Sequence, residues 1–237
     1  MITIKKSNER GKTKWEWLDS YHSFSFGEYY DPQNLHFGPL RVINDDIVAP
    51  GGGFPTHPHQ NMEIVTYVLS GALEHKDSTG THEVIRVGEL QKMTAGKGVY
   101  HSEFNGSQNN SVHLLQIWII PNKAGLEPSY DQRLWSVEER KNKLLKVASP
   151  NLNEDTIFIN QDSSIYISSL EAGNDLSFSN EDGRGIYLHI ISGEVELDNQ
   201  IYTNGDAIQV TENEIFKLKA ITDAELIAFE VKMNFNK

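Results

Sequence analysis

The sequence has no cysteine among its 237 residues. This absence excludes disulfides, thiolate nucleophiles, iron–sulfur clusters and structural zinc sites of the cysteine type, so any metal ion must be held by nitrogen and oxygen ligands. No segment approaches the roughly 18 consecutive apolar residues of a membrane span. The first six residues, MITIKK, lack the apolar stretch of a secretory signal. We therefore expect a cytoplasmic protein that makes no membrane contact.

Positive charge is also scarce. Lysine and arginine number 21 against 33 aspartates and glutamates, which gives a formal net charge of −12. The densest basic stretch, residues 138–146, carries its own glutamates and has the pattern of a solvated helix face. An acidic protein without a basic patch repels a phosphate backbone. We therefore expect no direct binding to nucleic acid.

Long helical patterns are absent from the first half, where short strand patterns are separated by turns. Glu63–Leu69, Glu83–Val87 and Val112–Ile120 are rich in β-branched or apolar residues, and glycine-containing turns divide them. Such spacing predicts an all-β sandwich or barrel. Strand patterning returns in the second half, at residues 165–167, 185–191, 194–197, 207–210, 216–220 and 226–231.

A connector is expected between the two halves. Ser136 followed by Glu139 has the form of a capping box, which predicts a short helix over residues 137–145. We therefore expect two domains, residues 1–135 with the metal site described below, and residues 136–237 with the helical connector.

A faint internal repeat supports this division. Residues 63–69 followed by Ser70-Gly71 resemble residues 186–191 followed by Ser192-Gly193, and each copy then reaches a Gly-acid pair. Chance similarity of two generic strand–turn–strand units is the alternative. A true repeat would indicate two small related β-barrels.

The first 50 residues are rich in aromatic side chains. They are interpreted as a hydrophobic lid or edge packed on a sheet, and a substrate-binding aromatic box is the alternative. Residues 22–26 alternate in character, as a strand would. The aromatic residues before residue 31 are Trp15, Trp17, Tyr21, Phe24, Phe26, Tyr29 and Tyr30.

Three histidines give the strongest functional signal. His57 and His59 flank Pro58, and on an extended chain residues i and i+2 project to the same face. Pro58 fixes its own φ and biases His57 toward extended geometry, so less order must be imposed when a metal ion binds. His101 and Glu103 repeat the i, i+2 arrangement further along the chain. Together the two pairs predict a metal site.

The remaining histidines are isolated in the sequence. A lone histidine is more often a hydrogen-bonded surface or core residue than a metal ligand, so none is assigned to the site. These residues are His22, His36, His75, His82, His113 and His189.

The strand pattern does not decide which glutamate is the carboxylate ligand. Glu63 projects to the same face as His57 and His59 if one strand runs unbroken from His57 to Glu63. Glu103 projects to the same face as His101. Imidazole and carboxylate suit Fe(II), Mn(II), Ni(II) or Zn(II). Three histidines and one carboxylate leave one or two positions open on a five- or six-coordinate ion, as a catalytic metal needs. A metal-free buried polar cluster would require desolvation of several ionisable groups without a compensating charge.

These residues resemble the two cupin motifs, and longer segments resemble one cupin branch, the pirin family with its bacterial quercetinase-like members. The motif residues are Gly51, His57, His59 and Glu63 in the first motif and Gly88, Gly98, His101 and Asn105 in the second. Departures are Gly71, one residue later than usual, and Thr94 in place of a proline. The pirin-like segments, between about Asp19 and Arg133, are HSFSF (22–26), YYDP (29–32), LRVINDD (40–46), THPH (56–59) and MTAG (93–96).

The resemblance implies a bicupin, in which two antiparallel barrels of jelly-roll type pack together and only the N-terminal one binds metal. The second half agrees, since it contains no His-x-His and a single histidine. In pirins the ligands correspond to His57, His59, His101 and Glu103, so the resemblance favours Glu103 over Glu63. It implies one Fe(II) ion, although Ni, Mn, Co, Cu and Zn suit the same donors.

The resemblance further implies a quercetin 2,3-dioxygenase, which opens the heterocyclic ring of quercetin-type flavonols with O2 and releases carbon monoxide. Glu103 would be a ligand that also serves as the catalytic base. We expect a monomer whose partners are a flavonol-like molecule and O2. The competing hypothesis is a non-enzymatic, iron-dependent and redox-sensing regulator that binds a transcription factor or a metabolic enzyme. Because cupins host many chemistries, an isomerase or another oxygenase is the third reading.

Overall fold

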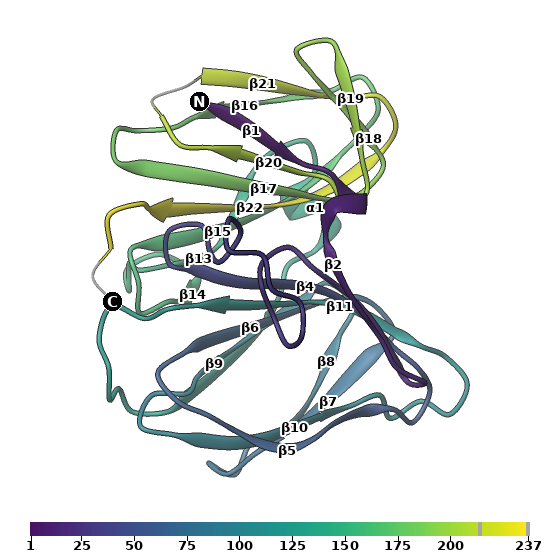
Figure 1. Cartoon of the computed structure of the whole chain (residues 1–237), viewed down its shortest axis with the longest axis vertical. Coiled ribbons are helices and arrows are strands. Elements are labelled where there is room, and N and C mark those ends of the chain that lie inside the picture. Colours follow the sequence, from purple (N-terminus) through teal and green to yellow (C-terminus); the bar gives the residue numbers. More distant parts are fainter. Residues whose placement is uncertain (213–214, 236–237) are drawn as a thin grey trace. The chain divides into compact units, whose positions relative to one another are not determined.

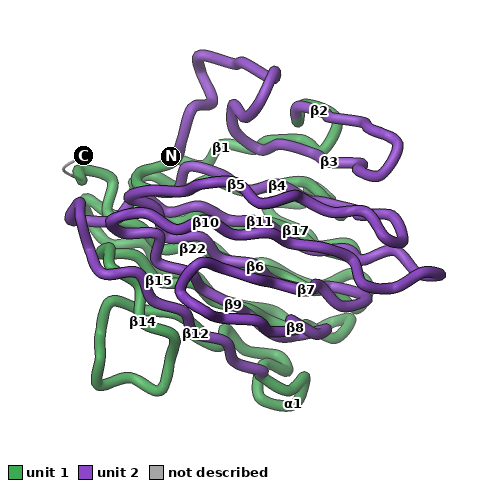
Figure 2. Tube along the Cα trace, turned by 90° about the horizontal axis from the view of Figure 1, so that it is seen from below, with its two compact units in different colours: residues 1–10, 37–39, 135–236 green, residues 11–36, 40–134, 237 purple. Residues whose placement is uncertain are grey.

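The computed structural model describes residues 1–212 and 215–235, and these are almost entirely β-structure (Figure 1). The chain forms two compact units (Figure 2): unit 1 comprises residues 1–10, 37–39 and 135–236, and unit 2 comprises residues 11–36 and 40–134. The N-terminal residues belong to unit 1 because β1 (Ile2–Lys5) pairs with β20 (Ala207–Val210). No helix among the described residues is long and apolar enough to span a membrane.

Unit 2 consists of two antiparallel sheets. The larger has the order β12-β9-β6-β11-β4-β3-β2, and the smaller has the order β5-β10-β7-β8. Their strands are β2 (Gly11–Lys14), β3 (Leu18–His22), β4 (Leu40–Val48), β5 (Gly53–His59), β6 (Glu63–Ser70), β7 (Ala72–Asp77), β8 (His82–Arg86), β9 (Glu89–Thr94), β10 (Val99–Phe104), β11 (Val112–Ile119) and β12 (Ser129–Leu134).

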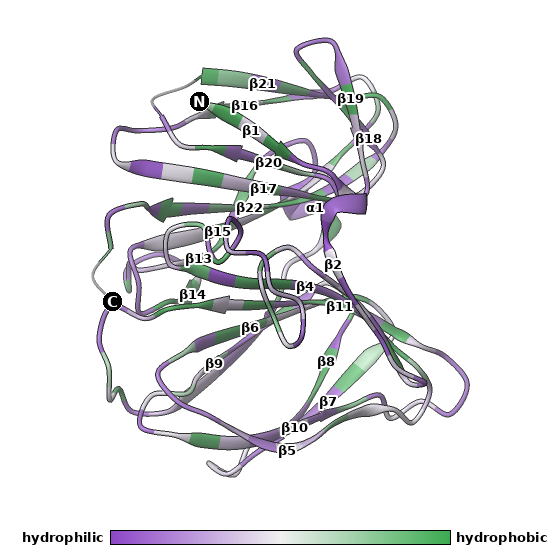
Figure 3. Cartoon of the chain, in the orientation of Figure 1, coloured by the Kyte–Doolittle hydropathy of each residue, from purple (hydrophilic) through white to green (hydrophobic). Residues whose placement is uncertain are grey.

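The core of unit 2 lies between its two sheets, because each strand turns alternate side chains inward. Leu73 and Ile85 of the smaller sheet pack in one cluster with Val48 and Leu114 of the larger sheet. Figure 3 shows hydrophobic segments on the strands of both units, where they alternate with hydrophilic ones, and largely hydrophilic connecting loops. Not every inward position is apolar, and the polar ones form the site described below.

Unit 1 repeats this two-sheet arrangement. Its sheets have the orders β1-β20-β17-β22-β15-β13-β14 and β16-β21-β18-β19, and among the strands of the described residues only β13 and β14 pair in parallel. The remaining strands are β13 (Leu145–Ser149), β14 (Ile157–Phe158), β15 (Ser163–Leu170), β16 (Asp175–Ser179), β17 (Arg184–Ser192), β18 (Glu194–Leu197), β19 (Gln200–Thr203), β21 (Ile215–Ala220) and β22 (Ala224–Lys232). The all-β class expected from the strand patterns is confirmed.

The internal repeat has a structural counterpart. The central order β9-β6-β11-β4 in unit 2 corresponds to β20-β17-β22-β15 in unit 1, and β5-β10-β7-β8 corresponds to β16-β21-β18-β19. Gly71 and Gly193 occupy equivalent turns with φ of 77° and 85°. A Cβ at either position would approach a backbone oxygen too closely, at 2.8 Å from Ser111 or 2.3 Å from Asp223. Both turns therefore require glycine.

The connector helix is shorter than its sequence pattern predicts. The capping box is present, since the Ser136 hydroxyl accepts a hydrogen bond from the Glu139 amide, but α1 covers only Val137–Arg140. The expected continuation to residue 145 was wrong. Asn142 has a positive φ of 54°, and its amide donates to Ser169 O, so a tertiary contact ends the helix before β13 begins.

The aromatic N-terminal segment of unit 2 is only partly a strand. β3 ends at His22, so the strand expected over residues 22–26 was wrong beyond its first residue. Phe26 instead forms an isolated bridge with Tyr29, and the hydroxyl of Ser25 accepts a hydrogen bond from the Asp31 amide. These local bonds form a compact loop after β3.

Candidate metal centre

Antiparallel pairing of β5 with β10 brings the predicted ligands together. His57 lies opposite His101 in the register, whereas Phe54 lies opposite Glu103. Three steps along β5 thus match two steps along β10, which is a β-bulge at Pro55 and Thr56. Proline is tolerated at such a bulge because no ladder hydrogen bond is required there.

Three imidazoles converge at this pairing. The ring centroids of His57 and His59 are 4.8 Å apart, those of His57 and His101 are 4.5 Å apart, and those of His59 and His101 are 4.9 Å apart. One ligand nitrogen from each ring lies within 4.8 Å of the other two. His101 therefore lies next to the two histidines of the His-Pro-His.

The tautomer of His57 is fixed by the bulge. Its Nδ1 lies 2.8 Å from the carbonyl oxygen of Pro55, which can only accept, so Nδ1 carries the proton. The lone pair of Nε2 then points at the cluster, and Nε2 lies 3.1 Å from His101 Nε2. A second ring nitrogen bonded to a backbone carbonyl is the usual arrangement of a metal-ligating histidine.

Burial keeps two of these imidazoles neutral. The pKa of His59 falls to about 4, first because of burial and then because of the neighbouring His101 and His57. The pKa of His101 falls to about 3, again through burial and through His57. Neutral imidazoles offer lone pairs to a cation at neutral pH.

Glu103 lies beside this cluster and is held by two donors. Thr66 Oγ1 donates to one carboxylate oxygen at 3.2 Å, and Gln116 Nε2 donates to the other at 2.9 Å. Its carboxylate groups with His75 and His101 within 4.8 Å rather than with all three histidines. Glu103 therefore adjoins the cluster at the His101 side.

Glu63, the alternative carboxylate, has other partners. It is fully buried and accepts a hydrogen bond from Thr94 Oγ1 at 3.2 Å, and Lys92 Nζ lies 3.9 Å away. The candidate ligand groups found among the described residues include Glu103 and do not include Glu63. The geometry thus favours Glu103, as the family resemblance does.

His75 is the site residue that the sequence analysis missed. It is fully buried, its ring centroid is 5.4 Å from that of His101, and its Nε2 is 3.1 Å from Asp77 Oδ2. On β7 it lies opposite Glu103, while Asp77 lies opposite His101. The sequence shows that His75 and Asp77 project to the same face of a strand, but it does not show that this strand pairs with β10.

Among the other histidines, His22 and His113 are accounted for by hydrogen bonds. His113 Nε2 lies 2.6 Å from Asp45 Oδ1, and His22 lies 2.8 Å from both Thr13 Oγ1 and Asn44 Oδ1. His36 and His82 are exposed, and His189 is buried in unit 1. None belongs to the candidate ligand groups of the described chain.

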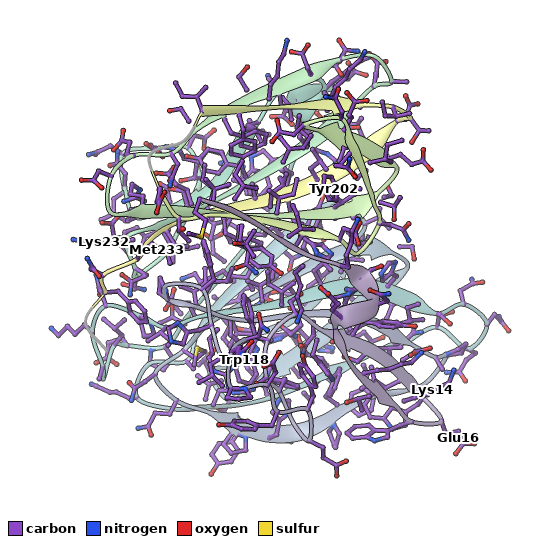
Figure 4. All side chains as sticks on the ribbon, turned by 45° about the horizontal axis from the view of Figure 1, so that its top comes forward. Lys14, Glu16, Trp118, Tyr202, Lys232 and Met233 are labelled. Atoms are coloured by element: carbon purple, nitrogen blue, oxygen red, sulfur yellow. The ribbon has the colours of Figure 1, made fainter. Side chains whose placement is uncertain are left out.

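A cavity of about 180 Å³ opens beside the cluster. A cavity of roughly 150 Å³ can hold benzene, so at least one aromatic ring fits. The Trp118 ring meets the His59 ring edge-on at 4.8 Å and the Phe26 ring at 5.5 Å. In Figure 4 Trp118 lies among the crowded interior side chains, whereas Lys14 and Glu16 extend from the edge. The cavity is lined by Thr13, Trp15, Leu18, Ser20, His22, Phe26, Gly27, Glu28, Asn44, Asp46, Phe54, His57, His59, Ile64, His101, Glu103, Gln116 and Trp118.

Some aromatic residues of the N-terminal segment therefore line the cavity. Trp15 and Phe26 do so, whereas Phe24 is buried and Tyr30 is largely exposed. Trp15 and Phe26 thus have the position that the aromatic-box alternative requires, whereas Phe24 is packed in the interior.

The equivalent strands of unit 1 carry apolar residues. Phe178 of β16 lies opposite Phe216 of β21, and their rings stack at 4.7 Å with an angle of 2°. This pairing corresponds to that of β5 with β10 in unit 2. Leu176 and Leu218 face each other two residues further along. Apolar packing thus occupies the region where unit 2 gathers its histidines.

The donor set of unit 2 fits a divalent cation. It offers three clustered imidazoles and an adjacent carboxylate, the nitrogen and oxygen donors suited to first-row ions. His101 Nδ1 is buried and has no hydrogen-bond partner among the described residues. His101 is therefore not committed to a structural hydrogen bond through that atom. His57, His59, His101 and Glu103 are the residues able to hold the ion.

Comparison with known proteins gives the family. Residues 3–119 match Pirin, and residues 146–231 match the quercetinase C-terminal cupin domain. An Escherichia coli K12 protein named quercetin 2,3-dioxygenase is 38% identical over 231 residues, which cover 98% of this chain and 99% of that protein.

Two solved structures extend this similarity to the fold. The crystal structure of YhhW from Escherichia coli is 37% identical, covers 100% of both chains and has a TM-score of 0.94. The complex of the bacterial pirin YhhW with nickel(II) is 37% identical, covers 98% of this chain and 99% of that chain, and has a TM-score of 0.92. The expected bicupin organisation is confirmed, and the chain belongs to the pirin family.

Proposed function

We propose that this protein is a metal-dependent dioxygenase that cleaves the heterocyclic ring of quercetin-type flavonols with O2 and releases carbon monoxide. The observation that carries the proposal is the convergence of His57, His59 and His101 beside Glu103 at an aromatic-lined cavity. The name of the Escherichia coli relative supports the same activity.

His57, His59, His101 and Glu103 would hold one divalent ion, for which we propose Fe(II). The structure of the Escherichia coli pirin YhhW in complex with nickel(II) supports a first-row ion as the cofactor. The ion would act as a Lewis acid that lowers the pKa of a flavonol hydroxyl and brings the substrate and O2 together. Nitrogen and oxygen donors suit several such ions, so metal analysis of the native protein is the direct test of its identity.

Glu103 would accept the proton of the flavonol 3-hydroxyl at a carboxylate oxygen. Thr66 and Gln116 hydrogen-bond to this carboxylate from β6 and β11, and two fixed donors hold it in one orientation. Removal of the proton makes the flavonol electron-rich, as attack on O2 requires. Glu103 is therefore the proposed catalytic base as well as a ligand.

The walls of the cavity would bind the flavonol rings and exclude water. Trp118, Phe26 and Phe54 provide aromatic surfaces beside the histidines. Aromatic pairs favour edge-to-face or offset contacts, and these would orient a planar substrate. A small-molecule cavity next to the donor set favours an enzyme over the iron-dependent regulator, which requires only an accessible ion.

The test is aerobic turnover of quercetin by the iron-loaded protein, followed by loss of flavonol absorbance and by detection of carbon monoxide. His57→Ala should lower the rate at least 100-fold, because the ion loses a ligand fixed by Pro55. His82→Ala, at an exposed position, is the matched control and should retain the rate. Equal rates in the wild type and His57→Ala would remove the enzyme proposal.

A further inference from the structure

Asp46 is the buried carboxyl group of the cavity that the proposed reaction does not use. It lies on β4, with Ser20 of β3 on one side in the register and Leu114 of β11 on the other. The residue is 2% exposed and lines the same cavity as His57 and Glu103. Its Oδ1 is buried and has no hydrogen-bond partner among the described residues.

Such an atom requires an explanation, because buried polar atoms in proteins are almost always hydrogen-bonded. Burial raises the pKa of Asp46 to about 7, and the hydrogen bond with Ser20 acts in the opposite direction. Leaving a buried acceptor unsatisfied costs on the order of the desolvation of that group. The position therefore carries a stability cost that a ligand can offset.

The neighbouring polar residues do not supply the missing donor. Asn44 Oδ1 can only accept from His22 Nδ1 at 2.8 Å, so His22 Nε2 accepts from the Thr13 hydroxyl. His22 is thus bonded at both ring nitrogens. Asp46 lines the cavity beside these bonded residues, and its Oδ1 is a buried acceptor without a donor among the described residues.

Lysine and arginine do not supply the donor either. None of the residues that line the cavity in the described chain is lysine or arginine, while Glu28, Asp46 and Glu103 all carry carboxyl groups. A molecule bound in the cavity can therefore supply the donor that Asp46 Oδ1 lacks. A hydroxyl on an uncharged aromatic molecule meets this need, because a phenol donates well to a carboxylate and brings no like charge.

We propose that Asp46 is a specificity-determining residue, whose Oδ1 accepts a hydrogen bond from a phenolic hydroxyl of the bound aromatic molecule. This hydroxyl is distinct from the one that faces Glu103 and the histidines. The inference rests on the proposed function for the class of ligand, a hydroxylated flavonoid. Discrimination follows because an analogue without that hydroxyl leaves the buried acceptor unsatisfied.

The test measures equilibrium binding under nitrogen by the full-length, metal-loaded protein. The probes are quercetin and flavonols that keep the 3-hydroxyl but lack one or more of the other hydroxyls. The wild type should bind quercetin at least 10-fold more tightly than one of these analogues. In Asp46→Leu this ratio should fall to near one, while metal content stays at the wild-type level. Asp45→Asn, on the same strand but bonded to His113, should keep the ratio.

Asp46→Asn provides a second variant of nearly the same shape if the leucine variant does not fold. Its neutral amide should reduce the binding ratio at least threefold, because the carboxylate acceptor is lost. A ratio that persists in every folded variant, or a wild type that binds all the analogues equally, would overturn the proposal. An Asp46-dependent ratio without any turnover would leave this inference standing and remove the dioxygenase. Turnover together with a binding ratio that does not depend on Asp46 would support the dioxygenase and remove this inference.

Discussion

His57 and His101, 44 positions apart in the sequence, face each other across an antiparallel strand pair with their Nε2 atoms 3.1 Å apart. The bulge at Pro55 and Thr56 makes this pairing compatible with an inward Phe54 on the same strand. The two imidazoles define the centre of the proposed metal site.

Metal binding should stabilise the protein through this cluster. With Fe(II) or Ni(II) at about 100 times its dissociation constant, the unfolding free energy should rise by about 2.7 kcal/mol. For a chain of this size the melting temperature should rise by roughly 5–10 °C. His57→Ala should abolish most of this shift, and His82→Ala should keep it. A shift of equal size in His57→Ala, measured by scanning calorimetry, would place the ion elsewhere.

Glu103 and Glu63 should differ in their effects on metal binding and on stability. Glu103→Gln removes the proposed anionic ligand and base, so metal content and quercetin turnover should both fall at least 10-fold. Glu63→Gln should retain the metal. It should lose on the order of 3 kcal/mol of stability, because the buried Lys92 would lose the carboxylate that lies 3.9 Å from its Nζ. Metal analysis and urea denaturation of both variants check this, and metal loss in Glu63→Gln alone would reverse the assignment.

Stability should depend on pH through Asp46. Its pKa is raised from 3.8 to about 7 in the folded state, so the folded protein holds this proton more tightly than the unfolded chain. Its stabilising contribution is complete below about pH 4 and is lost as the pH rises through about 7. Relative to the wild type, metal-free Asp46→Asn should therefore gain stability between pH 4 and 7, by at most about 4 kcal/mol. Parallel denaturation profiles for the two proteins would contradict the raised pKa.

The stacked phenylalanines of unit 1 should matter for stability and not for metal binding. Phe178→Ala removes a buried ring that stacks on Phe216 at 4.7 Å. Such truncations typically cost about 3–5 kcal/mol. Metal content of the folded variant should remain at the wild-type level, because the candidate ligands all belong to unit 2. Metal loss in folded Phe178→Ala would show that unit 1 contributes to the centre.

Local sequence signals explain much of the fold. Alternation of side chains predicted most strands, and the glycines at positions 71 and 193 predicted the two equivalent turns. The capping box predicted where α1 begins but not where it ends; the helix ends at Arg140, and two residues later the Asn142 amide is bonded to Ser169 of a distant strand. Signals within a few residues determine how an element starts, whereas a distant strand can determine where it stops.

The sequence by itself determined that any metal must bind nitrogen and oxygen, and that His57 and His59 share a face with each other, as His101 and Glu103 do. The tertiary structure decided which strands become neighbours. It placed Glu103 beside His101 and Glu63 within 3.9 Å of Lys92. It also placed His75 opposite Glu103 and Asp46 in the wall of the cavity. The physical reason is that side-chain direction along a strand is a local property with a period of two. Sheet order and register depend on pairing between segments far apart in the chain.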